Sequence, residues 1–441
     1  MSFAKKGIAA LVLTGAALAV SSAYAAGFQL TEQSSLGLGR AYAGAGIVGD
    51  DLSAVHYNPA GMTLLEGTRV QAGFTWIALN ADIDGAGAYA GQSENGRLKG
   101  QAIPTGYVTH QVNDQVWLGF GMSVPYGMGT EYGNDWFGAN RGIKAKIYTF
   151  DMNPNIAWKV NDLISLGAGL SVQYAKADLS MNAGGLGVGE IDADSWDWGF
   201  NLGVMISPTD TLRFGLSYRS SIEHNAEGDF SFATQGIPGV LPIPMSQTLS
   251  SEATVKTPDT IMLTGTWEAT PDLRLSGLIR WANWSNFDTL TIKNDISGMA
   301  SVMDFLTQSM TLEQKKAMGE IMTQLGNYSI HNKWQDTWLF SVGADYRIND
   351  AFTVRGGIAY ETSPIDDETT RMAVIPDTDR LWLSLGATYH FSKDLQFDVG
   401  ATYLMGVGDM DLYKDYKNNE KIGEYQSLDA YLIGFQAQYR F

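Results

Sequence analysis

Few residues of the chain are placed to carry out chemistry on a substrate. Five histidines and no cysteine are present among 441 residues, which excludes thiol chemistry and disulfides. His110, His331 and His390 fall within predicted strands, and no serine stands beside them at a spacing that suggests a nucleophile with its base. We therefore predict that the chain is not an enzyme, and we expect neither a cofactor nor a metal ion.

Three basic residues are better candidates for a role with a ligand. Lys176, Arg219 and Arg380 fall on the inward face of their predicted strands, if the alternation described next holds. A buried carboxylate without a partner costs several kcal/mol, so a base in such a place could bind the carboxylate of a ligand. Each base could equally belong to a structural ladder of charges, and Arg380 is our first choice.

The elements that would position these residues are strands, because apolar side chains recur at every second position from Glu66 to the end. The last strand shows the pattern clearly, with Tyr431, Ile433, Phe435, Ala437, Tyr439 and Phe441 on one face. A chain that ends on an aromatic residue after such alternation resembles the signal read by the outer-membrane assembly machinery. A soluble sandwich would also alternate, so the period alone does not decide the class.

The connections between the strands separate these two classes. Short turns such as Asn113-Asp114 and Asn161-Asp162 alternate with long stretches. The long stretches lie near residues 83–98, 132–142, 181–192, 229–250, 294–330, 367–377 and 411–424. Short turns at one end and long loops at the other are typical of an outer-membrane barrel. Seven long loops close seven hairpins, so we predict an all-β fold, a 14-stranded antiparallel transmembrane β-barrel over residues 66–441.

The extreme N-terminus has the features of a secretory signal. Lys5 and Lys6 precede an apolar run over residues 7–20, and Ala23-Tyr24-Ala25 supplies the small residues of a cleavage site. The run is shorter than the roughly 20 residues that a membrane-spanning helix needs. We therefore predict a signal peptide over residues 1–25 and localisation in the outer membrane of a Gram-negative cell.

Residues 26–65 show neither strand alternation nor a long amphipathic helix. Their apolar side chains, Phe28 among them, weigh against a disordered periplasmic arm. In Asn58-Pro59-Ala60 the proline lacks an N–H and favours a turn. We predict that residues 26–65 form a hatch inside the barrel, with Phe28 at an inner ligand site. We expect Asn58, Pro59 and Ala60 to form a fixed turn without hydrogen bonds to the wall.

The third predicted strand is interrupted by Pro125-Tyr126-Gly127. Proline cannot donate to a ladder, and glycine permits a bend. If the third strand loses its hydrogen bonds to the neighbouring strand at this point, the wall would open toward the lipid. The alternative interpretation is an ordinary β-bulge near the rim of the barrel. The predicted inner face mixes Trp117 and Trp382 with polar groups, which suits an amphipathic ligand better than a water-filled pore.

Two of the predicted loops are apolar for a surface. Ile237 and Leu241 lie in a stretch with three prolines that favours an extended loop. Met318 and Met322 share one face of a predicted helix that begins with a capping box at Thr311. Methionine suits an adaptable apolar surface. These loops could collect a hydrophobic ligand, or the helix could simply pack on neighbouring loops.

Several stretches of the chain carry a resemblance to a known family. They are AGFQLTEQSSLGLGRAYAGAG with DDLSAVHYNPA near the N-terminus, PYGMGTEY at 125–132, VLPIPM at 240–245 and IPDTDRLWLSLGATYHFSKD at 375–394. Together they resemble the FadL family of outer-membrane long-chain fatty-acid transporters. The resemblance implies capture by external loops, binding at an internal site, rearrangement of the hatch, and lateral exit at the third strand. It also implies an acidic residue near the opening, at Glu361.

The expected partners follow from this resemblance and from composition. A net charge of −18 argues against nucleic acid. We expect a long-chain fatty acid or a related hydrophobic ligand, outer-membrane lipid, and a monomeric chain. Uptake of aromatic or other hydrocarbons by the same route is an alternative, as is a general porin or structural barrel. The predicted helix lies between the ninth and tenth strands, whereas family members can carry a helical insertion after the fifth.

Overall fold

The computed structural model describes residues 27–96, 100–182, 187–234, 244–299, 304, 307–308, 310–414 and 419–441. The predicted signal peptide over residues 1–25 and the loop residues Ile237 and Leu241 lie outside these ranges. Among the described residues, no helix is long and apolar enough to cross a membrane.

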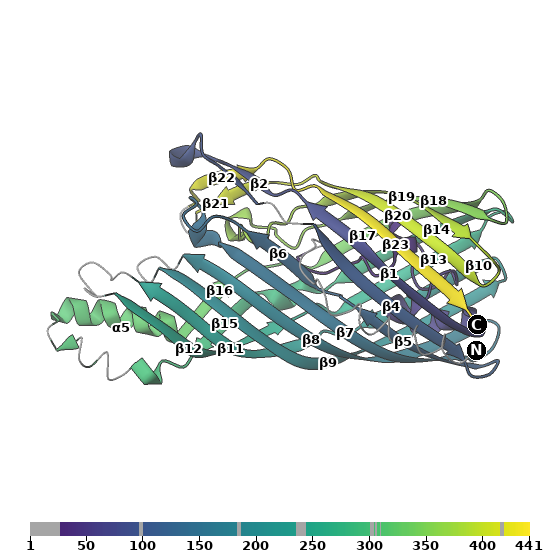
Figure 1. Ribbon diagram of the computed structural model, residues 1–441, viewed down its shortest axis with the longest axis horizontal. Coiled ribbons are helices and arrows are strands. Elements are labelled where there is room, and N and C mark those ends of the chain that lie inside the picture. Colours follow the sequence, from purple (N-terminus) through teal and green to yellow (C-terminus); the bar gives the residue numbers. More distant parts are fainter. Residues whose placement is uncertain are drawn as a thin grey trace, which may run out of the picture.

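The fold is a closed antiparallel β-barrel, drawn in Figure 1. Its wall comprises β1 (Thr68–Leu79), β4 (Gln101–Gln111), β5 (Val116–Ser123), β6 (Gly127–Glu131), β7 (Lys144–Lys159), β8 (Ile164–Asn182), β9 (Val188–Thr209), β10 (Leu212–Arg219), β11 (Glu223–Thr234), β12 (Met245–Lys256), β13 (Thr260–Glu268), β14 (Leu273–Ala282), β15 (Thr289–Asn294), β16 (Asn327–His331), β17 (Thr337–Arg347), β18 (Phe352–Glu361), β19 (Arg380–His390), β20 (Leu395–Gly406) and β23 (Ala430–Arg440).

The predicted strand number is confirmed. Five strands of the wall are each divided into two segments, namely β5/β6, β10/β11, β12/β13, β14/β15 and β16/β17, so the 19 segments make 14 strands. The barrel closes because β1 pairs with β4 on one side and with β23 on the other. The C-terminus lies at one end of the barrel in Figure 1, and α5 (Leu312–Gly326) lies at the other.

The alternation of side chains explains why these segments form a membrane wall. In β19, Leu383 and Leu385 are exposed on the outer face, whereas Arg380, Trp382 and Ser384 are buried inside. Apolar side chains can face lipid only if every backbone group is bonded within the protein, and a closed barrel meets that condition. The predicted inward direction of Trp382 and its neighbours is therefore confirmed.

The external ends of the hairpins are more regular than predicted. Residues 181–192 and 229–250 contain the ends of β8, β9, β11 and β12, because these strands extend beyond the length needed to cross a membrane. Other loops form a second sheet of β2 (Asp82–Gly85), β3 (Ser93–Asn95), β21 (Asp411–Tyr413) and β22 (Lys421–Tyr425). The remaining short helical turns are η3 (Gly87–Tyr89), η4 (Ala139–Arg141), η6 (Trp284–Phe287), η7 (Ser297–Met299) and η8 (Glu368–Thr370).

The N-terminal segment over residues 27–65, called the plug below, occupies the interior of the barrel. It contains α2 (Ser35–Leu38), α3 (Ala54–Tyr57) and η2 (Pro59–Leu64). The helix α2 contacts β19, β20 and β23, whereas η2 contacts β5, β7, β8 and β9 on another part of the wall. A segment that touches widely separated strands while nearly all its side chains are buried must lie within the lumen.

The turn at Asn58 has a clear local cause. Its side-chain oxygen accepts from the Ala60 amide at 3.1 Å, and Pro59 fills the first position of η2, where no amide donor is required. The expectation that this turn makes no hydrogen bond to the wall is wrong. Asn58 Nδ2 donates to the carbonyl oxygen of Val204 at 3.1 Å and to that of Leu216 at 3.5 Å. One side chain thus caps the turn and ties it to two strands.

A ring of inward-facing glycines surrounds the plug. An added Cβ at any of nine of them would come closer than 3.0 Å to a plug atom; among the described residues these are Gly119, Gly167, Gly203, Gly215, Gly343, Gly357, Gly386, Gly400 and Gly434. A buried ion pair reinforces this fit, because Arg40, which pairs with Asp50 of the plug at 2.8 Å, also pairs with Asp345 of β17 at 3.3 Å. The body of the plug therefore packs directly on the backbone of the wall.

Candidate ligand site and wall opening

The wall is incomplete beside the third strand. β5 ends at Ser123 and β6 begins at Gly127. The ladder between β4 and β5 runs only from the Gly106–Met122 pair to the Gln111–Trp117 pair, and β6 pairs with β7 alone. Among the described residues no ladder joins β4 to β6, so the backbone ladder of residues 102–105 of β4 runs along β1 alone. The sequence Pro125-Tyr126-Gly127 thus lies at a gap between two neighbouring strands.

The first residues of the plug, Gly27 to Gln33, form an arm that covers this gap from inside. The Leu30 amide donates to the carbonyl oxygen of Pro125 at 2.8 Å, and the Gly127 amide donates to that of Phe28 at 2.9 Å. Gln33 adds a pair of hydrogen bonds to the backbone of Val124. The arm therefore takes the place of a neighbouring strand for residues 124–127.

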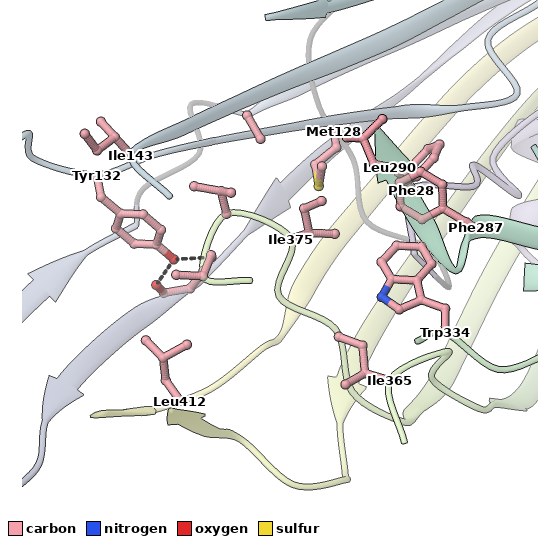
Figure 2. Packing of buried hydrophobic residues seen from close by; sticks show 14 of the residues in the cluster. Phe28, Met128, Tyr132, Ile143, Phe287, Leu290, Trp334, Ile365, Ile375 and Leu412 are labelled. Atoms are coloured by element: carbon pink, nitrogen blue, oxygen red, sulfur yellow. Dashed lines mark hydrogen bonds between the residues drawn. The ribbon is translucent and has the colours of Figure 1, made fainter. Parts of the chain in front are cut away.

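Phe28 is the apolar anchor of the arm. Its ring lies 4.8 Å from the ring of Trp284, 5.4 Å from Phe287 and 6.1 Å from Trp334, measured between centroids. Figure 2 shows Phe28 close to Phe287, Leu290 and Trp334. The packing of aromatic edges on faces adds to the free energy of burial. Movement of the arm would remove Phe28 from this cluster.

An apolar cavity lies beside Phe28, toward the external end of the barrel. Aliphatic side chains of β7, β8, β9 and β15 line it together with Phe28, and Lys144 and Lys176 lie at its edge. Lys176 pairs with Asp192 at 2.9 Å, and Lys144 pairs with Asp178 at 2.6 Å and Glu190 at 3.1 Å. These ion pairs lie on the outer face of the wall, because Glu190 and Asp192 are exposed there while Ile191 between them is buried. The interior of the cavity is therefore apolar.

The prediction that Lys176 faces inward is wrong, because it lies on the outer face of β8, directly opposite the exposed Asp194, and only borders the cavity. Arg380 and Arg219 do not line this cavity. Arg380 is buried and faces the carboxylates of Glu361 and Asp377, each at 3.5 Å. Asp377 also accepts from the amide of Gly27 at 2.8 Å. The first choice, Arg380, therefore belongs to an internal charge cluster at the root of the arm, because the loop residue Asp377 reaches into the lumen.

Glu361 lies in the same charge cluster and accepts from Arg280 Nη2 at 2.6 Å. The arm contributes Glu32, which is fully buried and whose two carboxylate oxygens make no hydrogen bond among the described residues. Burial raises the pKa of the Glu32 carboxyl to about 8, and the nearby Glu361 carboxylate acts in the same direction. Glu32 is thus a neutral acid near pH 7.

Arg219 lies on a different side of the arm. Its guanidinium donates to Ser171 Oγ at 2.6 Å and to the carbonyl oxygen of His56 at 3.0 Å, and it lies 3.5 Å from Asp151. It lines a second, more polar cavity together with Arg280. Arg219 is therefore bound to the plug and to the wall at once.

Sequence reasoning missed Arg280, Glu32 and Gln33. Arg280 could have been found, because it shares the inward face of its strand with Leu278. Glu32 and Gln33 lie in a segment without periodicity, where no pattern states which way a side chain points. Their positions follow from the tertiary contacts of the arm.

The histidine that lies closest to hydrolase chemistry is His224, which borders the apolar cavity. Ser195 Oγ and Asp197 Oδ2 meet the same ring nitrogen, Nδ1, at 3.1 and 3.2 Å, and Nε2 meets Gln173 at 3.0 Å. A nucleophile–base–acid chain requires the two partners on opposite nitrogens. This arrangement is a polar network of the wall.

The external helix α5 begins with the predicted capping box at Thr311. Met318 and Leu325 are buried, and Met322 packs against a cluster that includes Phe232 and Leu249 near the outer ends of β11 and β12. The apolar face of the helix is thus largely used in packing on neighbouring elements. Met318 and Met322 stay candidates for ligand collection only if this packing can open.

Comparison with known proteins decides the family. A family model described as "Outer membrane protein transport protein (OMPP1/FadL/TodX)" matches residues 16–441. The chain belongs to this family. Members of the OMPP1/FadL/TodX family are outer-membrane transporters of long-chain fatty acids and hydrocarbons, so this member is a transporter of the Gram-negative outer membrane and not an enzyme.

Individual relatives agree with this assignment to the OMPP1/FadL/TodX family. A "Long-chain fatty acid transport protein" of Escherichia coli O6:H1 is 30% identical over 92% of this chain and 91% of its own. The fold matches a Pseudomonas aeruginosa FadL homologue, with a TM-score of 0.78 and 23% identity over 94% of this chain and 100% of the other. It also matches the Ralstonia pickettii toluene transporter TbuX, with a TM-score of 0.67 and 16% identity over 92% and 98%.

Proposed function

We propose that this protein takes up long-chain fatty acids and releases them sideways into the outer membrane. The single observation that carries the proposal is the apolar cavity that Phe28 of the arm lines. An alkyl chain suits this apolar lining. A relative that is 30% identical is a long-chain fatty acid transport protein, which favours a fatty acid over a hydrocarbon.

The lateral exit is supported by the missing ladder between β4 and β6 and by the arm that covers it. Each CH₂ group that stays out of water contributes about 0.8 kcal/mol, so a fatty acid gains by passing from the cavity straight into lipid. One barrel contains the cavity, the arm and the gap. We therefore propose that a monomer is sufficient for transport.

The choice between fatty acid and hydrocarbon is tested by comparing cells that carry the wild-type protein with cells that lack it. The wild-type protein should raise the uptake of oleate well above the uptake of cells that lack the protein. Wild-type protein that supports toluene uptake but no oleate uptake would favour the hydrocarbon alternative, and uptake of neither would favour a general porin or structural barrel.

Lateral exit is tested by joining β5 to β6. From Ser123 to Gly127 the chain advances by four residues while its partner β7 advances by only three, from Asp151 to Tyr148. Deletion of Pro125 alone removes the extra residue and brings β6 into register with β5. Barrels that assemble with a closed wall should bind oleate but fail to deliver it to the cell. Normal uptake through a wall that hydrogen exchange shows to be closed would contradict lateral exit and favour passage through the plug to the periplasm.

A further inference from the structure

A second cavity lies on the other side of the arm from the apolar cavity. Its volume is about 50 Å³, and Arg219, Arg280, His56 and Tyr57 line it beside the strand break. Phe28 lines the apolar cavity, whereas its neighbours Gln29 and Leu30 line the second one. The arm is therefore the partition between an apolar compartment and a cationic compartment.

Arg280 depends on the arm for one of its partners. Its Nη1 donates to Thr31 Oγ1 at 2.8 Å, and its Nη2 donates to Glu361 Oε1 at 2.6 Å. Withdrawal of the arm would remove Thr31 and leave a buried charged donor without an acceptor. Such a donor costs free energy until another oxygen replaces the lost one.

Arg219 is also incompletely neutralised. The Asp151 carboxylate lies at 3.5 Å, a long ion pair, and the shorter hydrogen bonds of Arg219 go to the neutral oxygens of Ser171 and His56. Side chains of two cationic residues thus border one small space. The space is large enough for a small polar group, since about 10–15 Å³ on this measure holds one water molecule.

We propose that this second cavity is a transfer site for the ligand carboxylate, used after the arm has left the strand break. This inference rests on the proposed function. The carboxylate replaces Thr31 at Arg280 and is bound by Arg219, while the alkyl chain lies along the space vacated by Phe28 and Leu30 toward Pro125. The site takes fatty acids and other amphipathic anions, and it does not bind uncharged hydrocarbons.

The test compares charge-balanced variants, because removal of one partner alone would leave a buried unpaired charge. Two double variants each remove one ion pair of the wall. The first combines Arg219→Gln with Asp151→Asn, and the second combines Arg280→Gln with Glu361→Gln. Oleate uptake should fall by about tenfold in each pair of changes, the loss expected for a charge-assisted hydrogen bond. Oleyl alcohol uptake, and the affinity of the purified protein for oleate at the apolar cavity, should change by less than about twofold on the same scale.

Arg347→Gln is the control, because Arg347 pairs with Asp272 at the surface of a short turn and should leave uptake unchanged. Equal losses for oleate and oleyl alcohol, or no loss of oleate uptake, would overturn the transfer site while the proposed function stands. Wild-type protein that carries no oleate would defeat both. If neither double variant assembles, crystals of the Gln33→Ala protein with 2-bromooctadecanoate decide: anomalous density between Arg219 and Arg280 supports the site, and density in the apolar cavity alone overturns it.

Discussion

The side chain of Gln33 is bonded to the backbone of Val124 as one strand is bonded to another. Gln33 Nε2 donates to the Val124 carbonyl oxygen at 2.7 Å, and the Val124 amide donates to Gln33 Oε1 at 3.3 Å. An amide side chain has the same donor and acceptor as a peptide group. The wall opening is therefore covered by a side chain that can leave without unfolding a strand.

Replacement of Gln33 by Ala should loosen the arm. Both backbone groups of Val124 lose their partners, so protection of residues 27–33 from amide hydrogen exchange should fall by about tenfold, the effect of one or two lost hydrogen bonds. Gln29→Ala is the control on the same arm, because Gln29 Oε1 makes no hydrogen bond among the described residues. Equal protection in Gln33→Ala and wild-type protein would contradict the role of Gln33.

Docking of the arm should weaken as pH rises. Glu32 faces Glu361, Arg280 and Arg380, and burial raises its pKa from 4.5 to about 8 in the docked arm. Above about pH 4.5 a released arm has lost the proton of Glu32, whereas the docked arm keeps it up to about pH 8. Docking therefore takes up a proton between these two pH values, and its free energy becomes less favourable as the pH rises. Exchange of residues 27–33, corrected for its intrinsic pH dependence, should be faster at pH 9 than at pH 5. Glu32→Gln should reduce this difference.

The two roles of Asn58 can be separated by two substitutions. Asn58→Ser keeps an oxygen that can cap η2 but removes the amide donor to Val204 and Leu216, whereas Asn58→Ala removes both functions. The cap contributes about 1 kcal/mol, so Asn58→Ala should make the plug more sensitive to protease than Asn58→Ser. Barrel assembly, judged by heat modifiability on gels, should persist in both. Identical digestion of the two variants would mean that only the wall bonds matter.

Adjacent glycines of β18 provide a matched test of the glycine ring. A Cβ at Gly357 would come closer than 3.0 Å to the backbone of Arg40, whereas a Cβ at Gly356 would meet only Leu385 and Ser384 at 3.5 and 3.6 Å. Gly357→Ala should therefore displace the plug and lower the unfolding temperature. Gly356→Ala should have little effect. Similar melting curves for the two variants would show that the plug adapts freely to the wall.

The wall could be predicted from the sequence, whereas the details of the interior could not. Alternation in segments such as 380–390 states which side chains face lipid, because the period of two leaves only two choices. The partners of Arg380 could not be predicted, since Asp377 arrives from a loop. The contact between Gln33 and Val124 joins an aperiodic segment to a strand break, and neither element carries a pattern that indicates the other.

The glycine ring has a consequence for the order in which the protein folds. Nine strands hold the plug so closely that no Cβ would fit between them, and β1 pairs directly with β23 at the barrel seam. We infer that a finished barrel is too narrow at this level to admit the plug, so β23 must close on β1 around a plug that is already in place. A plug peptide added to a barrel assembled without it should then fail to enter. The plug, which is N-terminal and therefore synthesised before the barrel, would act as the template around which β23 completes the wall.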